Sequence, residues 1–415
     1  KFSEKDAARL PEYYARIEAV ADVLRDLSVK TPPNPKQGIK AALSAALQLW
    51  PIATKGNQVH RDVYDLFTKS ARSFLDSWFE NEHIKAAFGF DAIVGNFASP
   101  DTPGSAYVLL HHVFGEIDGE KGAWGHAIGG MGAITQAMEK ACKNVGVKIF
   151  TDTPVNKVIV KGNAAVGIEL ENGSSIEANK IISNLNPKLL YKQLISENEL
   201  EPEFNRSMDG YKCGSGTFRM NVALSELPDF SALPGKEAAE HHQSGIVIAP
   251  TLDYMDKAYI DAKLQGWSLE PIVEMLIPST MDNTLAPEGK HVASLFCQQF
   301  SPAMPDGSSW HDHRLAAADT IIETVTKHAP NFRESILGMM ILSPLDLEEK
   351  FGLIGGDIMH GQMSLDQMWA ARPLMNFGNY RGPLKSLYMC GSGTHPGGGV
   401  TGLPGKNAAR EILKD

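Results

Sequence analysis

Apolar residues recur at helical spacing through most of the first 128 positions of this 415-residue chain. Ser3 and Asp6 have the spacing of a capping box, so a helix is expected to begin there. After the proline-rich stretch 32–35, a second helix has four apolar residues on one face: Ile39, Leu43, Leu47 and Trp50. Apolar positions from Val63 to Trp78 keep the same spacing and predict a further helix. Region 1–128 is therefore expected to be mainly helical.

The apolar face of the second helix has two interpretations. Lys36 and Lys40 lie beside it, as in a helix that rests on a membrane surface and gives access to a lipophilic substrate. A face packed against the protein core is the favoured interpretation, because amphipathic helices usually face a core.

From Gly129 onward the pattern changes to a glycine turn, a helix and then strands. Gly146 is expected just after the last helical turn, before a strand over 147–150. Alternating apolar and polar residues then predict strands over 155–160, 165–171 and 174–177, with turn residues at 162–163 and 172–173 between them. This is a β-meander, and Ile181 and Ile182 predict a short buried strand after it.

The remaining chain predicts an α+β module followed by a short α/β segment. Strand-like runs occupy 217–224, 245–249, 272–277 and 291–298, and a helix is expected over 313–328. The last segment has an apolar strand from Leu387 that runs into glycines and then a helix near Gly402. The predicted fold class is accordingly a combination of α/β and α+β.

The closing glycines, at 391, 393, 397, 398, 399 and 402, are the strongest functional signal. Glycine lets backbone N–H groups approach a ligand, and the start of a helix offers further unsatisfied donors. A plain connection without a ligand is the alternative, but three consecutive glycines carry an entropic cost that such a loop does not require. We interpret this segment as half of a cofactor site. Gly129, Gly130 and Gly132 fit either a tight turn or a site equally well.

Composition narrows the classes of function. A hydrophobic content of 43%, a charged content of 21% and a net charge of -10 are ordinary for a folded globular protein and argue against binding nucleic acid. No run approaches the roughly 18 apolar residues of a membrane span. His311 and His313 flank Asp312 without a further identifiable ligand, and Asp312 has the position of a helix N-cap, so no metal site is predicted. No nucleophile triad or paired carboxylates are recognisable, which suits chemistry carried by a cofactor.

Four segments together resemble the phytoene desaturase-like family of FAD-dependent oxidoreductases. They are Gly-Ala-Trp-Gly-His-Ala-Ile-Gly-Gly-Met-Gly (122–132), Thr-Pro-Val-Asn-Lys-Val (153–158), Ile-Ile-Ser-Asn (181–184) and Cys-Gly-Ser-Gly-Thr-His-Pro-Gly-Gly-Gly-Val (390–400). The resemblance implies a Rossmann-like FAD domain with a ββα core and a β-meander, plus a substrate domain of mixed sheet and helices. It divides the chain into a helical substrate or lid region (1–128), an FAD-domain segment (129–190), an α+β substrate domain (191–380) and a final FAD-domain strand and helix (381–415).

The resemblance also implies roles for individual residues. Val155 would contact the FAD adenine through its backbone. Four residues would lie near the pyrophosphate and ribityl chain: Gly391, Ser392, Gly393 and Thr394. Four would lie near the isoalloxazine ring: His395, Pro396, Gly399 and Val400. Gly130 and Met131 would border the flavin from the substrate side. No catalytic residue follows from the resemblance.

The chain departs from the family at its N-terminal end. The N-terminal Gly-x-Gly-x-x-Gly unit and the acidic residue that binds the ribose are absent, and the sequence starts at Lys1 without an initiator methionine. We therefore expect the C-terminal portion of an FAD-dependent oxidoreductase that transfers hydride from a lipophilic small molecule, with FAD bound weakly or not at all by this chain alone. A non-catalytic or regulatory protein of the same fold, and a flavin-dependent isomerase, are the alternatives.

The resemblance implies a cytoplasmic location in a bacterium and a mitochondrial one in a eukaryote. A peripheral membrane contact and a protein partner are both left open.

Overall fold

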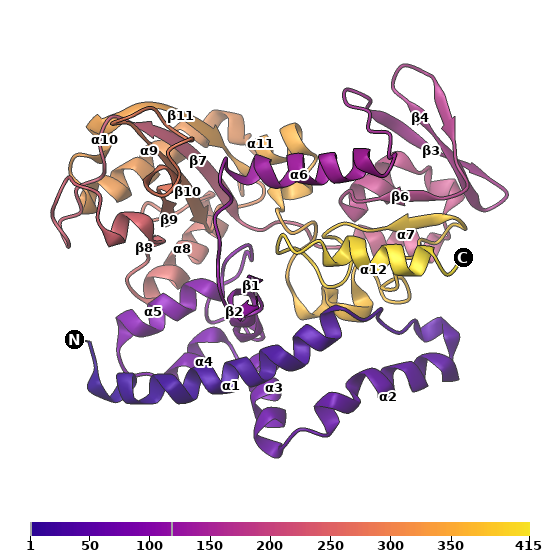
Figure 1. Cartoon of the computed structure of the whole chain (residues 1–415), viewed down its shortest axis with the longest axis horizontal. Coiled ribbons are helices and arrows are strands. Elements are labelled where there is room, and N and C mark those ends of the chain that lie inside the picture. Colours follow the sequence, from indigo (N-terminus) through magenta and orange to yellow (C-terminus); the bar gives the residue numbers. More distant parts are fainter. Residues whose placement is uncertain (1, 118) are drawn as a thin grey trace.

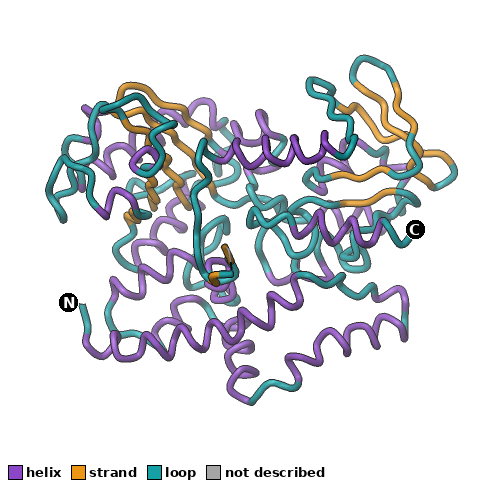
Figure 2. The backbone as a smooth tube through the Cα atoms, in the orientation of Figure 1, coloured by secondary structure: helices purple, strands orange, loops and turns teal. Residues whose placement is uncertain are grey.

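The computed structural model describes residues 2–117 and 119–415, apart from the side chains of residues 37 and 112 (Figures 1 and 2). The helices are α1 (Glu4–Ser28), α2 (Ile39–Ala53), α3 (Asn57–Thr68), α4 (Ala71–Asp76), α5 (Glu82–Asp91), α6 (Met131–Asn144), α7 (Pro202–Asp209), α8 (Leu252–Gln265), α9 (Trp310–His328), α10 (Phe332–Ser335), α11 (Pro344–Phe351) and α12 (Leu403–Ile412). The strands are β1 (Glu116–Ile117), β2 (Glu120–Lys121), β3 (Val155–Lys161), β4 (Ala164–Leu170), β5 (Ser175–Glu177), β6 (Ile181–Ser183), β7 (Thr217–Leu224), β8 (Ile246–Ile248), β9 (Ile272–Leu276), β10 (His291–Gln298), β11 (Ile336–Leu342) and β12 (Leu387–Met389).

Ser3 caps α1 as predicted, whereas Asp6 has a different role from the one that a capping box gives it. The Ser3 hydroxyl accepts a hydrogen bond from the Asp6 N–H at 3.1 Å. The buried Asp6 carboxylate accepts from the backbone N–H groups of Glu80 and Asn81, each at 2.9 Å. Asp6 therefore ties the start of α1 to the chain that enters α5.

The helix predicted from Val63 to Trp78 is in fact two helices. Ser70 has an extended backbone, which interrupts the helix after α3. Its hydroxyl accepts from the Ser73 N–H at 3.1 Å and caps the start of α4. Leu66, Phe74 and Leu75 are nevertheless buried in one core with α1 and α5. The apolar period continued across the break because both helices face the same core.

The favoured prediction for α2, a face buried against the core, is wrong. Its apolar residues Ile39, Leu43, Leu47 and Trp50 are all exposed, and Ala41 is the buried residue of this helix. The side that faces the protein carries Gln48, whose amide donates to the Thr31 carbonyl at 2.8 Å. The helix is therefore held by small and polar side chains, and Figure 1 shows it along the outer edge of the molecule.

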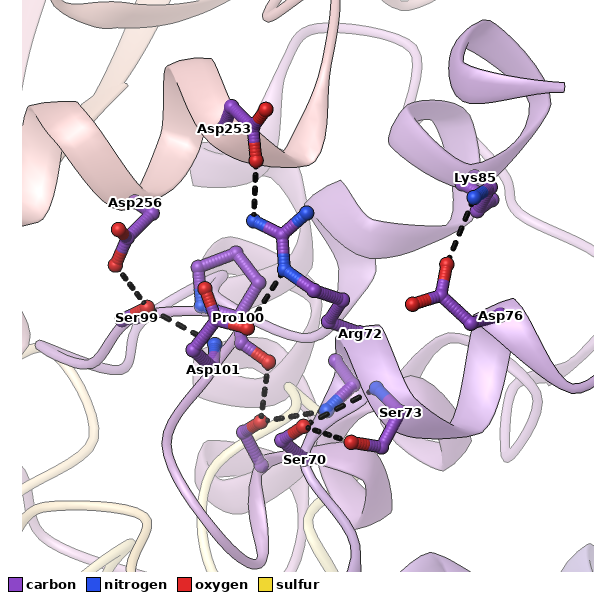
Figure 3. Close-up of polar contacts among 12 residues, drawn as sticks. Ser70, Arg72, Ser73, Asp76, Lys85, Ser99, Pro100, Asp101, Asp253 and Asp256 are labelled. Atoms are coloured by element: carbon purple, nitrogen blue, oxygen red, sulfur yellow. Dashed lines mark hydrogen bonds and ion pairs between the residues drawn. The ribbon is translucent and has the colours of Figure 1, made fainter.

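A polar junction joins the helical region to α8 (Figure 3). Arg72 of α4 forms ion pairs with Asp101 at 2.6 Å and with Asp253 of α8 at 2.8 Å. The Ser99 hydroxyl donates to Asp256 of the same helix at 2.5 Å. These contacts hold the loop that follows α5, which contains Ser99 and Asp101, against α8.

The α+β module is built on a five-stranded sheet in the order β11-β7-β10-β9-β8. The pairings in this sheet are antiparallel, with Leu295 of β10 opposite Met220 of β7 and Met275 of β9. These three side chains are buried with α9 residues such as Ile321, so α9 covers one face of the sheet. The four predicted strands and the helix are present within three residues of their expected bounds. The prediction missed β11 and α8.

The β-meander forms as predicted, with β3, β4 and β5 in a three-stranded antiparallel sheet. Gly146, with φ of 84°, follows α6 in the left-handed conformation expected of a helix C′ residue. The short strand β6 pairs in parallel with β12, so the two segments that resemble an FAD domain lie side by side. Ile182 is 45% exposed, contrary to the predicted burial, whereas Leu387 and Tyr388 of the partner strand are buried.

The strand predicted over residues 147–150 is absent. No partner strand hydrogen-bonds to this stretch among the described residues, and Val147, Ile149 and Phe150 are exposed. An extended apolar segment becomes a strand only when a neighbour satisfies its backbone groups.

Within residues 2–117 and 119–415, no helix combines the length and the apolar content needed to cross a lipid bilayer.

Asp346 offers a test of how α11 is held. Ser343 and Asp346 form a reciprocal capping box, and Arg314 donates to the Asp346 carboxylate at 2.8 Å. Burial opposes the charged form, but hydrogen bonds from Ser343 and the charge of Arg314 outweigh it and hold the pKa of Asp346 below its usual value. We expect Asp346→Asn to lower the free energy of unfolding by about 1–3 kcal/mol at pH 7.

A lowered carboxyl pKa stabilises the fold above the unfolded value, about 3.9, and loses this contribution as the pH falls through the folded value. The difference between wild type and Asp346→Asn in urea unfolding should therefore narrow below about pH 4. Glu349→Gln, which removes an exposed partner of His311, is the control and should cost below about 1 kcal/mol. An equal loss at pH 3 and pH 7 would contradict the electrostatic origin.

Candidate functional site

The C-terminal glycine segment, defined as residues 391–402, is anchored by the parallel pair β6–β12. Leu387, Tyr388 and Met389 lie opposite Ile181, Ile182 and Ser183. The Cys390 N–H continues the ladder to the Ser183 carbonyl at 2.8 Å. Beyond this point the chain turns away from the sheet and reaches α12 (Figure 2).

Gly391 and Gly393 are glycines because the backbone passes very close to its neighbours. A Cβ on Gly391 would lie 2.3 Å from the Asn184 carbonyl oxygen. A Cβ on Gly393 would lie 2.6 Å from Cδ of Pro187. Thr394 closes the turn by donating its N–H and its hydroxyl to the Gly391 carbonyl at 3.0 and 2.8 Å. The segment is therefore a defined turn packed on the loop that follows β6.

The buried side chain of Arg372 hydrogen-bonds to this turn from the protein interior. Its guanidinium is fully buried and donates to the carbonyls of Ser392 at 3.0 Å, Met359 at 2.7 Å, Gly361 at 3.2 Å and Gln367 at 3.2 Å. A rigid planar guanidinium can serve several acceptors at fixed angles, which an ammonium cannot do. Arg372 thus connects residues 359–367 with the glycine segment.

Asp357 is the buried carboxylate of the same region. It accepts from the N–H groups of Gly214 and Met359, both at 2.8 Å. Burial raises the pKa of Asp357, while those two N–H groups and the charge of Arg372 oppose the rise. The two charged residues therefore fix the loop 356–363 between the α+β module and the glycine segment.

His395 presents a buried hydrogen-bond acceptor. Its Nε2 lies 3.1 Å from the Leu27 carbonyl of α1, which can only accept, so Nε2 carries the proton. Burial lowers the pKa of His395 to about 4, so the ring is neutral near pH 7. Nδ1 is then an unprotonated acceptor, and it is buried without a hydrogen-bond partner among the described residues.

Residues 397–402 form the outer part of the segment. Gly397 and Gly399 have φ of 109° and 131°, and a Cβ on Gly399 would lie 3.4 Å from Cε1 of His111. Burial lowers the pKa of His111, so its imidazole beside Gly399 is neutral at pH 7. Val400 is 78% exposed with φ of 57°. Gly402 begins α12 without a side-chain cap.

Gly397, Gly399 and Gly402 also match Gly-x-Gly-x-x-Gly letter by letter. In the dinucleotide fingerprint this sequence directly follows a strand and opens the crossover helix of a βαβ unit. Here the turn at 391–397 separates it from β12, so the match does not directly follow a strand. The match therefore does not replace the N-terminal turn.

Met359 links the glycine segment to the α+β module. Its side chain lies between Gly398 and Gly95, since a Cβ would meet Met359 atoms at 2.7 Å and 2.6 Å, respectively. The Gly95 N–H donates to Gln298 at the end of β10 at 3.3 Å. The sheet and the glycine segment are thus connected through the loop after α5.

One face of the five-stranded sheet is not covered by α9. Arg219 of β7, Phe296 of β10 and Glu274 of β9 are cross-strand neighbours on it, and the Arg219 guanidinium stacks on Phe296 at 4.8 Å. Burial lowers the pKa of Arg219 and raises that of Glu274. Burial and the nearby Glu274 raise the pKa of Asp91 to about 7. This face, called the open sheet face below, packs at Phe296 against the core of the helical region and combines apolar surface with titratable groups.

Gly130 and Met131 lie at the N-terminal end of α6. The Gly129 N–H donates to the buried Asp282 at 2.7 Å, and Gly130 has φ of 77°. Hydrogen bonds from the Thr284 hydroxyl and from the Gly129 and Thr284 N–H groups lower the pKa of Asp282. Asp282 therefore anchors this turn to the α+β module. A position at the substrate side of a flavin stays a prediction for Gly130 and Met131.

Val155 lies at the start of β3, opposite Leu170 at the end of β4. A parallel bridge between Ala164 and Lys385 makes β4 run in the direction of β12. Val155 is therefore at the end of the meander toward which the glycine segment emerges, although no hydrogen bond between described residues joins the two. Its proposed contact with adenine stays a prediction.

The histidines around Asp312 have ordinary partners. His311 Nε2 lies 3.0 Å from Glu349, and His313 Nε2 lies 2.8 Å from the Ser308 hydroxyl. The N-cap of α9 is Ser309, not Asp312 as predicted, because the helix begins at Trp310. No set of three or more candidate metal ligands gathers anywhere in the described parts of the chain.

Sequence patterns did not indicate Arg372, Asp357 or His111. Each lies in a loop or a 3-10 helix whose residues follow no period, and some of their contacts, such as Asp357 with Gly214 and His111 with Gly399, join residues far apart in the sequence. The signal that could have found Arg372 is a long cationic side chain in an otherwise apolar stretch, but that signal alone has many explanations.

Comparisons with known proteins identify relatives among flavin-containing oxidoreductases. Residues 42–217 match the model of the family described as flavin containing amine oxidoreductase. Pyridine nucleotide-disulfide oxidoreductase domain-containing protein 2 of Rattus norvegicus is 38% identical over 100% of this chain and 74% of its own length. The lycopene-forming phytoene desaturase of Pantoea ananas is 24% identical over 84% of this chain and 66% of its own length.

Solved structures of low identity share the fold. An oxidoreductase from Methanosarcina mazei superposes with a TM-score of 0.54 at 16% identity, over 84% of this chain and 68% of its own. A double mutant of putrescine oxidase gives a TM-score of 0.53 at 13% identity, over 100% of this chain and 76% of its own.

The Arg372 contacts predict a large effect of substitution. Arg372→Met leaves four carbonyl acceptors unsatisfied and the buried Asp357 without its nearby cation, so we expect a loss of about 3–5 kcal/mol in the free energy of unfolding. Arg333→Met, which breaks the exposed ion pair with Asp319, is the control and should cost below about 1 kcal/mol. Equal losses in urea unfolding would show that Arg372 has no special role.

The close approach at Gly391 predicts a second effect. Gly391→Ala forces Cβ against the Asn184 carbonyl and should cost about 1–3 kcal/mol. Gly405→Ala in α12 places its Cβ 3.9 Å from the nearest atom and should be neutral or stabilising by up to about 1 kcal/mol. Thermal unfolding of the two variants measures the difference, and an unchanged midpoint for Gly391→Ala would contradict the packing described.

Proposed function

This chain belongs to the phytoene desaturase-like family of FAD-dependent oxidoreductases, and from that premise we propose that it is the C-terminal portion of an enzyme that removes hydride from a lipophilic small molecule. The observation that carries the proposal is the glycine segment, which leaves the parallel pair β6–β12 in a defined turn and ends at the start of α12. Such a segment supports a role as the flavin-facing part of a site.

The residues present fit part of FAD. Backbone at Gly391, Ser392, Gly393 and Thr394 is hydrogen-bonded by Arg372 and packs closely against Asn184, so it would offer a rigid surface to the pyrophosphate and ribityl chain. The buried Nδ1 of His395 would accept a hydrogen bond from a donor on the cofactor. Gly399 and Val400 would lie near the isoalloxazine ring. When bound, FAD supplies the acceptor for a hydride from a substrate carbon.

The phosphate-binding unit of the site would come from polypeptide outside these residues. Exposed apolar residues lie on α6 and in the loop between α6 and β3: Met138, Val145, Ile149 and Phe150. Residues 147–150 have no strand partner among the described residues, and β6, whose Ile182 is 45% exposed, pairs in its sheet with β12. A βαβ unit with Gly-x-Gly-x-x-Gly packed there would bury these side chains and satisfy the backbone of residues 147–150.

The open sheet face supports a lipophilic substrate. Val247, Leu276 and Met340 are partly exposed on it, and Phe296 lies between them in the sheet. A long apolar molecule would gain from contact with this surface. Gly130 and Met131 would border the substrate. The cytoplasm for a bacterial protein, or the mitochondrion for a eukaryotic one, is part of the same proposal.

Flavin retention tests the function. The natural full-length protein, including any segment upstream of this chain, should purify with visible flavin absorbance that bleaches anaerobically with one member of a panel of polyenes, terpenoids and long-chain amines. The 415-residue chain alone should show no saturable FAD binding at micromolar concentration, because the phosphate-binding turn is absent from its N-terminal part.

A pair of glycine variants localises the effect. Gly399→Leu should lower the flavin content of the full-length protein at least tenfold. Gly235→Leu is the control, since Gly235 has φ of 152° with no atom within 4 Å of its Cβ position. Full-length protein without flavin would refute the proposed function, and micromolar FAD binding by the 415-residue chain would refute the divided site.

A further inference from the structure

The outer side of α2 is an apolar surface that no part of the described chain covers. Ile39 is 89% exposed, Leu43 is 61% exposed, and Leu47 and Trp50 are each 66% exposed. Their spacing of four, four and three residues places them on one side of the helix. Single exposed apolar residues are normal, but a row of four large ones along one helix marks a contact surface.

The attachment of α2 keeps this surface outward. Ala41, Gln48 and Ile52 belong to the inner side, where the Gln48 amide donates to Thr31 and the Ile52 carbonyl lies 2.7 Å from Nε2 of His60. A rotation that buried Leu43 and Leu47 would break both contacts and expose the inner side instead. The outward face is therefore fixed by the local hydrogen bonds of the helix.

The charge around α2 has one sign. Residues 31–61 contain Lys36, Lys40, Lys55 and Arg61 and no acidic residue, in a chain with a net charge of -10. Lys40, Lys55 and Arg61 are exposed and form no ion pair among the described residues. Lys36 stacks on Phe377 at 4.6 Å. The apolar face thus has unneutralised positive charge at both of its ends.

We propose that α2 is a membrane-surface helix, whose apolar face enters the headgroup region of an anionic phospholipid bilayer. Leucine and tryptophan side chains partition into this region, and lysines at the ends of the helix bind anionic headgroups. A two-fold antiparallel pairing of α2 with a second copy is disfavoured, because it would bring Lys40 of one copy near Lys55 of the other. The proposal does not depend on the flavin chemistry.

Vesicle flotation tests this role with the natural full-length protein. Vesicles of phosphatidylcholine with phosphatidylglycerol are compared with vesicles of phosphatidylcholine alone. The protein should float with the anionic vesicles, less with the neutral ones, and less as sodium chloride is raised. The triple variant Leu43→Gln, Leu47→Gln and Trp50→Gln should bind at least tenfold more weakly.

Two controls keep the comparison specific. Leu264→Gln, Leu315→Gln and Phe351→Gln change equally exposed apolar residues on other helices and should leave flotation unchanged. Lys40→Gln with Lys55→Gln should weaken binding about fivefold for each charge removed, whereas Lys290→Gln with Lys327→Gln should not. Because all these side chains are exposed, circular dichroism should show the same fold in every variant.

Three results would overturn the proposal. The first is absence of flotation by the wild-type protein with anionic vesicles. The second is equal flotation by the α2 triple variant. The third is a wild-type dimer in sedimentation velocity that the same triple variant converts to a monomer without any vesicle binding, which would make a second copy the occupant of this face.

Discussion

Four backbone carbonyl oxygens from two loops converge on the buried guanidinium of Arg372. Carbonyl dipoles that point toward one another repel, so these loops adopt their paths only because a delocalised cation lies between them. Asp357 on the same loop supplies the nearby negative charge and also binds the Gly214 N–H. The turn at Gly391 to Thr394 can therefore be both glycine-rich and well defined, because the hydrogen bond from Arg372 restricts its backbone.

The same segment is also fixed by α1, which is distant in sequence. His395 donates to Leu27 at the end of α1, and Asn407 of α12 donates to the Ser28 carbonyl at 2.9 Å. The helical region thus reaches the glycine segment directly, and α2 follows a few residues later on the outside of the molecule. A membrane contact through α2 would therefore bring the helical region, and the glycine segment that is hydrogen-bonded to α1, close to the bilayer.

Strongly periodic or alternating segments could be predicted from sequence. The strands β7 and β10, the β-meander and the helix α6 with Gly146 after it agree with expectation, because local spacing decides which side of each element is apolar. The glycine segment was also predictable as a strand, a glycine turn and a helix. The break at Ser70 could not be predicted, because α3 and α4 face one core and the apolar spacing continues across the break.

The type of most elements and the apolar side of each follow from periodicity, which depends on neighbours along the chain. The direction in which those sides face follows from folding. Folding turned the apolar side of α2 outward, left residues 147–150 without a strand partner, and brought Arg372, Asp357 and His111 to the glycine segment. These outcomes depend on contacts between residues far apart in the chain, and a backbone group or a buried charge finds its partner only when the chain has folded.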